Sequence, residues 1–383
     1  MNTMTTNKSV DATLAVQEAA RVMGICNSCR YCEGFCAVFP AMERRLAFSA
    51  ADLHYLANLC HNCGACFHAC QYAPPHEFKI NVPRAMAEVR QETYVEHATP
   101  RTMGQLYSQQ GMAIVIAALV GFVISLIAAV MTLKDSSRLF QAGGELGFYT
   151  VVPHEVMVAL FGSVFVVALL SISVSCMRFW LRIRAAGSPI ALKASDGVKT
   201  ITAVSTLRYL HGGGEGCPSG SDRPSSKRRW LHHLVFYGFL LCFASTSVAT
   251  VYHYLLGWRA PYPLLSLPVV LGTVGGLAMT VGCLGIYRDR YRRDPNLIVR
   301  DQKAMDLGFV TLLFAVAVTG LVLLAVRETS LMPISLVVHL ASVMALFLLL
   351  PYSKFVHGIY RALALLYYYR EKRQPNPFAS SEG

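Results

Sequence analysis

The sequence predicts a mainly α-helical protein, in which a small cysteine-rich helical domain precedes a bundle of six transmembrane helices. Three observations lead to this fold class. The 383-residue chain has a mean hydropathy of +0.43 and only 15% charged residues, which is too apolar for an ordinary soluble protein. Eight of its twelve cysteines fall between Cys26 and Cys70. Six long apolar runs follow residue 105, so we expect residues 1–105 to form the cysteine-rich domain.

The clustered cysteines form an internal repeat with an offset of 34 residues, and each copy reads C-x2-C-x2-C-x3-C-x3-P. Three thiolates spaced two residues apart can reach three corners of one iron–sulfur cubane. The fourth cysteine typically ligates the other cluster in two-cluster ferredoxins. The spacing therefore predicts a ferredoxin-like domain with two [4Fe–4S] clusters. The expected ligands are Cys26, Cys29, Cys32 and Cys70 for the first cluster, and Cys60, Cys63, Cys66 and Cys36 for the second.

The repeat departs from the usual ferredoxin run, which places a proline directly after the fourth cysteine. Ala37 and Gln71 occupy those positions here, and the prolines come three residues later. Proline is not a ligand, so the expected ligand set is unchanged. Two structural zinc sites are the alternative, but zinc sites normally use C-x2-C pairs without a third cysteine two residues further on.

The segment between the two copies predicts a short helix that delivers Cys60. Ser49 and Asp52 have the spacing of a capping box, which marks the start of a helix. Gly64 is expected to serve the tight loop of the second copy. The three histidines among the cysteines are expected to be exposed polar residues without a role: His54, His61 and His68.

Six apolar runs are each close to the roughly 20 residues that a helix needs to cross a bilayer. They predict a membrane domain over residues 106–358, followed by a cytoplasmic tail over residues 359–383. The tyrosines of the tail, between 360 and 369, are interpreted as an interfacial aromatic belt. The predicted spans are 112–133, 156–176, 231–256, 264–287, 307–326 and 334–351.

The distribution of charge predicts the orientation of these spans. Residues 1–105 carry nine basic and nine acidic residues, so the net charge of +12 arises in the membrane half. Loop 177–230, loop 287–306 and residues 354–373 hold twenty-one basic residues, whereas the opposite side holds only Lys134, Arg138, Arg259 and Arg327. The positive-inside rule then predicts that both termini and the cysteine domain lie on the cytoplasmic side of a bacterial inner membrane. Basic residues that flank apolar runs indicate topology rather than a nucleic-acid partner.

The N-terminus shows no basic segment followed by an apolar run, which is the pattern of a secretory leader. The clustered cysteines are therefore expected to be reduced and metal-binding rather than paired in disulfides. Segment 211–227, rich in Gly, Ser and Pro, is expected to be a flexible cytoplasmic loop. It does not match GxxxxGK[ST], so it is not a phosphate-binding loop.

Histidines within membrane spans are functional candidates, because ionisable groups there are costly. Bis-histidine ligation of a b-type haem needs one imidazole from each of two facing helices. Antiparallel third and sixth spans would let His232 or His233 face His357, and His253 face His339. An unbroken last helix would place His339 and His357 on one face, five turns apart, but Pro351 lies between them. One or two b haems are expected; interfacial or snorkelling histidines are the alternative.

The cysteine repeat and the histidine-bearing membrane half together resemble the tricarballylate-utilisation protein B family (TcuB, also called CitB). The segments RRWLHHLVFYGFLLCFAST, residues 228–246, and HGGGEGCP, residues 211–218, carry the resemblance, which covers nearly the whole chain. The membrane half is more loosely similar to the haem-bearing gamma subunits of respiratory nitrate reductases.

The resemblance implies an electron-transfer function. Family members accept electrons from the reduced FAD of a separate tricarballylate dehydrogenase and pass them through iron–sulfur clusters and haem to a membrane acceptor, with quinone the expected one. This chain has no GxGxxG motif opening a βαβ unit, so the flavin is expected on the partner. The rival interpretation is a membrane transporter, or a redox or iron sensor. It is less favoured because no membrane repeat is evident and the charges lie at span ends.

Overall fold

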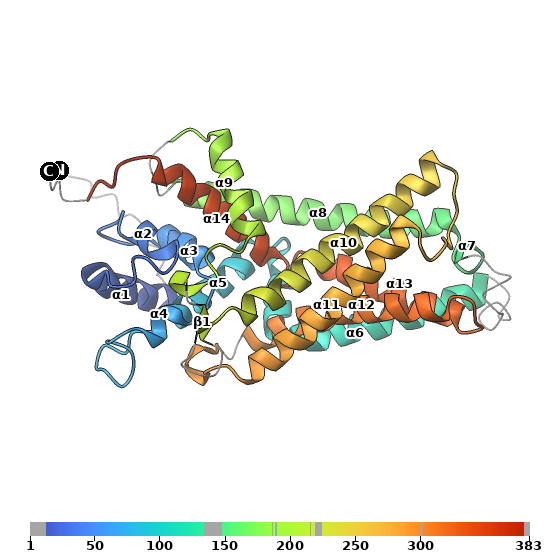
Figure 1. Ribbon diagram of the computed structural model, residues 1–383, viewed down its shortest axis with the longest axis horizontal. Helices are drawn as coiled ribbons and strands as arrows, with labels where there is room; N and C mark the ends of the chain where they lie inside the picture. Colours follow the sequence, from blue (N-terminus) through green and yellow to red (C-terminus); the bar gives the residue numbers. More distant parts are fainter. Residues whose placement is uncertain are drawn as a thin grey trace, which may run out of the picture.

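The computed structural model of the protein describes residues 13–133, 148–185, 187, 190–214, 216–218, 224–299 and 302–378. The molecule is elongated, with the cysteine-rich domain at one end and long apolar helices extending from it (Figure 1). Five helices build the domain: α1 (Leu14–Cys29), α2 (Val38–Met42), α3 (Ala50–Leu59), α4 (Ala65–His68) and α5 (Val82–His97). The mainly helical fold is confirmed, since the described strands are two residues each: β1 (Cys217–Pro218) and β2 (Pro224–Ser225).

Six helices in the described part of the chain are long and apolar enough to cross a membrane, which confirms the expected number. They are α6 (Arg101–Leu133), α8 (His154–Ala185), α10 (Lys227–Leu255), α11 (Leu267–Tyr291), α12 (Lys303–Val326) and α13 (Met332–Leu349). A short α7 (Phe148–Val151) precedes α8 at the end far from the cysteine domain. Four of the charges used to predict orientation lie outside the described residues: Lys134, Arg138, Arg223 and Arg300.

Small residues allow the apolar helices to pack closely. A Cβ atom added at Gly238 in α10 would lie 2.8 Å from the carbonyl oxygen of Gly275 in α11, and the reverse distance is also 2.8 Å. The two backbones therefore touch directly at this crossing, as small residues permit between helices in lipid. Because helices cannot attract one another through the hydrophobic effect in a bilayer, such contact is what holds α10 against α11.

The connections between the apolar helices return to the cysteine domain. Helix α9 (Ala194–Ser205) and η2 (Gly212–Gly214) lie between α8 and α10, and η3 (Pro295–Leu297) lies between α11 and α12. The turn η2 contacts α4, and η3 contacts α5. The loops expected to share one side of the membrane are thus gathered at one end of the molecule (Figure 1).

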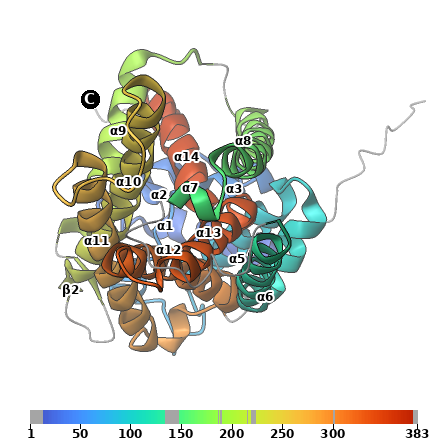
Figure 2. The ribbon, with the colours of Figure 1, turned by 90° about the vertical axis from the view of Figure 1, so that its right-hand side faces the viewer.

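A separate helix, α14 (Val356–Lys372), follows α13 and turns into the cysteine domain. It packs against α3, α8 and α9, and Figure 2 views this arrangement along the long axis. Tyr360 is 1% exposed and stacks on Tyr94 of α5 with a centroid distance of 5.7 Å. Tyr367 is also buried and packs edge-on against Tyr55 of α3. The interpretation of this aromatic segment as an interfacial belt was therefore wrong, because its rings are buried inside protein.

The predicted start of α3 is confirmed. The Ser49 side chain accepts a hydrogen bond from the Asp52 amide, and the Asp52 carboxylate accepts one from the Ser49 amide. The helix ends at Leu59 and delivers Cys60. His54, expected to be exposed, is instead buried in α3, where its Nδ1 lies 2.7 Å from the Thr93 hydroxyl of α5. It packs inward because α3 is enclosed on all sides between α5 and α14.

Candidate functional site

The first predicted cysteine quartet lines a cavity of about 240 Å³ together with Tyr31 and Tyr72. Cys26 and Cys29 lie in the last turns of α1, which ends where Arg30 adopts a left-handed conformation with φ of 53°. Cys32 follows in the next turn, and Cys70 comes from the segment after α4. The structure thus brings together three cysteines of the first repeat with the last cysteine of the second.

The second quartet lies deeper in the domain. Cys60 is buried at the end of α3, and Cys36 precedes α2. Cys63 and Cys66 lie around the start of α4, which Gly64 allows by adopting φ of +91°. The amide of Asn62 donates to the Cys60 Sγ over 3.3 Å, as amides in metal–thiolate loops do.

The ionisation of the thiols reflects the same grouping. Burial and then the neighbouring Cys32, Cys70 and Cys29 raise the pKa of Cys26 to about 12. Burial and then Cys60 and Cys63 raise the pKa of Cys36 well above its ordinary value. Four thiolates held this close repel one another unless a cationic core lies between them. Each quartet is therefore poised to release protons when it binds metal.

The donor sets fit two four-iron clusters. All eight groups are thiols, which are the usual ligands of [4Fe–4S] clusters. Among the described residues, no three His, Cys, Asp or Glu side chains converge closely enough to share one metal ion. The identity of the ligands stays a prediction, and the geometry supports the crossed division between the two repeats.

A pair of histidines lies where the domain meets the apolar helices. The ring centroids of His232 in α10 and His357 in α14 are 5.9 Å apart, with an interplanar angle of 60°. The Nδ1 of His357 donates to the carbonyl of Lys354, which leaves its Nε2 with a free lone pair. Burial lowers the pKa of His357 well below its ordinary value, with His232 and Arg361 adding to the effect. His357 is therefore neutral, as a metal ligand must be.

His232 has the complementary property. Its Nδ1 is buried and has no hydrogen-bond partner among the described residues. Orphaned buried nitrogens are rare, because leaving one unpaired costs about 1–3 kcal/mol. The two imidazoles together fit the axial positions of a b-type haem, one from each helix.

The other candidate histidines have different surroundings. The chain turns at residues 350–355, so His339 and His357 do not share an unbroken helix, contrary to the expected geometry. His339 lies 3.1 Å from the Thr319 hydroxyl of α12. His253 stacks on His154 at a centroid distance of 3.9 Å rather than facing His339, and His233 packs edge-on against Trp230. Among the candidate ligands in the described part of the chain, a ring contact is found between His232 and His357.

His61 lies between the second cysteine quartet and His232, although it was expected to have no role. Its Nδ1 accepts a hydrogen bond from Arg361 over 3.0 Å, and Arg361 also donates to the carbonyl of Cys60. Burial and then Arg361 lower the pKa of His61 well below its usual value. The expectation that His61 is exposed was wrong because α14, distant in sequence, covers it. Its position directly after Cys60 was the signal available. His68 is exposed, as expected.

Comparison with known proteins bears on both halves of the chain. The model of the citrate utilization protein B Fer4-like domain matches residues 19–96, which include both cysteine repeats. The model described as citrate utilization protein B matches residues 106–378. The chain belongs to the citrate utilization protein B family. The citrate utilization protein B of Escherichia coli is 50% identical over 358 residues, which cover 93% of each chain. No solved structure matches this member of the family.

The family membership confirms the resemblance found in the sequence. It makes the chain an iron–sulfur protein of citrate or tricarballylate utilization, with a Fer4-like domain next to six apolar helices. The match over residues 106–378 includes α14, so the helix that completes the cysteine domain belongs to the membrane half of the family pattern.

Proposed function

We propose that this protein is a membrane electron-transfer subunit that reoxidises the reduced FAD of a partner dehydrogenase, of the tricarballylate dehydrogenase type, and delivers the electrons to membrane quinone. One observation carries the proposal. The second cysteine quartet and the His232–His357 pair lie on either side of His61 and Arg361, so two redox sites would be neighbours.

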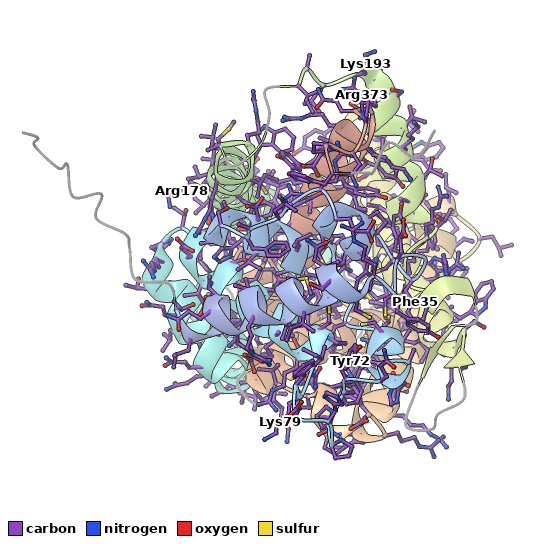
Figure 3. The ribbon with its side chains drawn as sticks, turned by 90° about the vertical axis from the view of Figure 1, so that its left-hand side faces the viewer. Phe35, Tyr72, Lys79, Arg178, Lys193 and Arg373 are labelled. Atoms are coloured by element: carbon purple, nitrogen blue, oxygen red, sulfur yellow. The ribbon has the colours of Figure 1, made fainter. Side chains whose placement is uncertain are left out.

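The exposed end of the domain suits the flavoprotein. Tyr72, which lines the cavity of the first quartet, lies on the face that Figure 3 views. Cys29 is exposed there, whereas Cys60 of the second quartet is buried. The first quartet is thus the one that a soluble partner can approach, and the second is the one nearer the membrane.

The clusters and haem, when bound, would supply one-electron carriers between a two-electron flavin and the membrane acceptor. The chain positions these groups and excludes water from the inner ones. His232 and His357 would hold one b haem at the cytoplasmic end of the bundle. The stacked rings of His154 and His253 cannot direct their lone pairs at a shared iron from opposite sides, so we propose one haem rather than two.

We propose a bacterial inner-membrane location, with both termini in the cytoplasm and the apolar helices in contact with lipid. Val167, Leu170 and Leu181 of α8 are more than half exposed and would face lipid chains. The concentration of basic residues at the cysteine-domain end supports this orientation. A cysteine domain in the cytoplasm would meet the reduced flavin where the partner produces it.

The test is the rate of flavin reoxidation in a stopped-flow experiment under anaerobic conditions. The partner dehydrogenase is reduced by its substrate and mixed with membranes that contain the wild-type protein or the Cys63→Ser variant. The variant should abolish reoxidation and leave the partner's own single turnover intact, whereas Cys176→Ser in α8 should behave as wild type. Unchanged reoxidation by Cys63→Ser would overturn the proposal, and substrate uptake by vesicles without a redox donor would favour the transporter.

A further inference from the structure

Four arginines converge on the loop that carries the second cysteine quartet. Arg90 from α5 and Arg361 from α14 donate to the Cys60 carbonyl, each over 2.5 Å. Arg228 from α10 and Arg293, just after α11, donate to the Asn62 carbonyl over 2.9 Å and 2.6 Å. Cys60 is an expected cluster ligand, and Asn62 lies one residue before the next ligand. Each of the four guanidinium groups therefore contacts the backbone of an expected ligand or of the residue next to one.

These four charges are not neutralised by carboxylates within the described part of the chain. Their hydrogen bonds go to backbone carbonyls or to His61, and none of the four forms a described ion pair. Asp306 is the carboxylate that favours the charged form of Arg293. It already forms ion pairs with Lys354 and Arg290. Burial lowers the pKa of Arg293 to about 9 and that of Arg361 to about 10. The Nε of Arg293 is buried without a hydrogen-bond partner.

An excess of buried positive charge is costly unless an anion balances it. A [4Fe–4S] core with four thiolate ligands supplies one. It is a dianion when oxidised and gains one further negative charge when it is reduced. The second quartet would place this anion within the ring of arginines, so each added electron would be stabilised there.

The first quartet has a different charge environment. Apart from the thiols, its cavity is lined by apolar, aromatic and amide side chains, among them Phe39, Gln71 and Tyr72. Arg30, at the end of α1, donates to the Asn27 carbonyl of its own helix. The two sites therefore have the same kind of expected ligand, cysteine thiolates, and differ in the charge around them.

We propose that Arg90, Arg228, Arg293 and Arg361 make the second cluster the more readily reduced of the two, so that electrons move from the exposed site to the site beside the membrane. The inference rests on the proposed function. In this step one electron leaves the first cluster, which is oxidised, and enters the second, which is reduced. No bond forms or breaks, and no proton moves. Net charge and hydrogen bonding around the ligands are established means of setting cluster potentials. The arginines are positioning residues, since none of them is a ligand.

The test is an anaerobic redox titration of the detergent-purified holoprotein, followed by EPR spectroscopy. The two signals are first assigned with Cys63→Ser, which removes the second cluster. In the wild type, the second signal should appear at the higher potential. Arg361→Gln should shift the midpoint of the second cluster downwards and leave the first unchanged, while Arg361→Lys, which keeps the charge, should stay close to wild type. The control is Arg44→Gln, because Arg44 is partly exposed and its described hydrogen bonds go to the carbonyls of Gln374 and Pro375 rather than to the cysteine loop.

The outcomes separate the inference from the proposed function. Two clusters with potentials that Arg361→Gln leaves unchanged, or shifts equally, would overturn the inference and leave the electron-transfer role standing. A wild-type protein without [4Fe–4S] signals would overturn both. If Arg361→Gln fails to assemble the second cluster, Arg228→Gln decides, because Arg228 reaches only the Asn62 carbonyl. The same selective downward shift is expected from it, and its absence would refute the tuning role.

Discussion

His232 and His357 lie face to edge, 5.9 Å apart, although one belongs to a membrane helix and the other to a helix that packs on the cysteine domain. The pair therefore lies where the two halves of the molecule meet. Because His357 is fixed through the Lys354 carbonyl, its free nitrogen points away from its own turn. A haem bound here would be held by both halves at once.

Replacing His357 by alanine should remove the haem. One axial ligand would be lost, so the sharp bands of a low-spin b haem should disappear from the reduced-minus-oxidised optical spectrum. The matched control is His339→Ala, since His339 is engaged with Thr319 and has no second imidazole beside it. Haem retained in full by the His357 variant, or lost from the His339 variant, would show that the ligand pair is assigned wrongly.

The crossed division of cysteines predicts which variants should resemble one another. Cys70→Ser should remove the same EPR signal as Cys29→Ser, although the two residues belong to different repeats. Cys36→Ser should in turn match Cys63→Ser. Each variant should lose close to half of the iron and acid-labile sulfide, whereas Cys283→Ser in α11 should keep the full amount. If Cys36 and Cys29 variants lost the same signal, each repeat would hold its own cluster.

The buried His54 predicts a loss of stability in mild acid. Burial and then Arg182 lower its pKa to about 3, below the ordinary value of 6.5. The unfolded chain therefore takes up a proton on this residue as pH falls below 6.5, whereas the folded chain does not. Stability is fully present above pH 6.5 and decreases towards pH 3. His54 alone should contribute on the order of 1–2 kcal/mol of this loss between pH 7 and pH 5.

The measurement is the thermal midpoint of the purified protein at pH 7 and at pH 5. His54→Leu should reduce the difference between the two values, since Thr93 keeps its bonds to Asn58 and to the Val89 carbonyl. An unchanged difference would mean that other groups, such as His97, dominate the acid response. Wild-type midpoints that rise on acidification would contradict the sign of the effect.

The ion pair between Arg45 and Glu371 should contribute strongly to docking of α14. The Nη2 atom of Arg45 lies 2.8 Å from the Oε1 atom of Glu371, and both side chains are less than 15% exposed. Glu371→Gln leaves Arg45 paired with Asp52 only, so a loss of about 1–3 kcal/mol in unfolding free energy is expected. Glu18→Gln breaks the exposed pair with Arg21 and should cost less than about 1 kcal/mol. Equal effects on the thermal midpoint would argue against a docking role.

The cysteine-rich Fer4-like domain and the number of apolar helices could be predicted because their signals are local. The spacing of Cys60, Cys63 and Cys66 follows from the reach of one loop, and helix length follows from bilayer thickness. The start of α3 could likewise be predicted from the spacing of Ser49 and Asp52. Each of these predictions depends on residues within a few turns of one another.

The role of α14 could not be predicted in this way. Tyrosines and basic residues just after an apolar helix have the same composition whether they lie at a membrane surface or inside a protein. Arg361 and Arg293 were counted as signals of membrane orientation, but both guanidinium groups are directed at the cysteine loop. Their partners, such as Cys60 and Asn62, are hundreds of residues away in the sequence. Because the helix is interrupted at residues 350–355, His339 and His357 do not lie on one face of a single helix, five turns apart.

The packing of α14 also sets an order of events during biosynthesis. The ribosome makes the cysteine loops first, but Arg361 and Tyr360 emerge only after all six apolar helices. Until then the Cys60 loop lacks one of its guanidinium partners and Tyr94 lacks its stacking ring. The cysteine domain therefore receives its last packing element only after the final apolar helix has been made, so a chain that ends before α14 would lack both contacts.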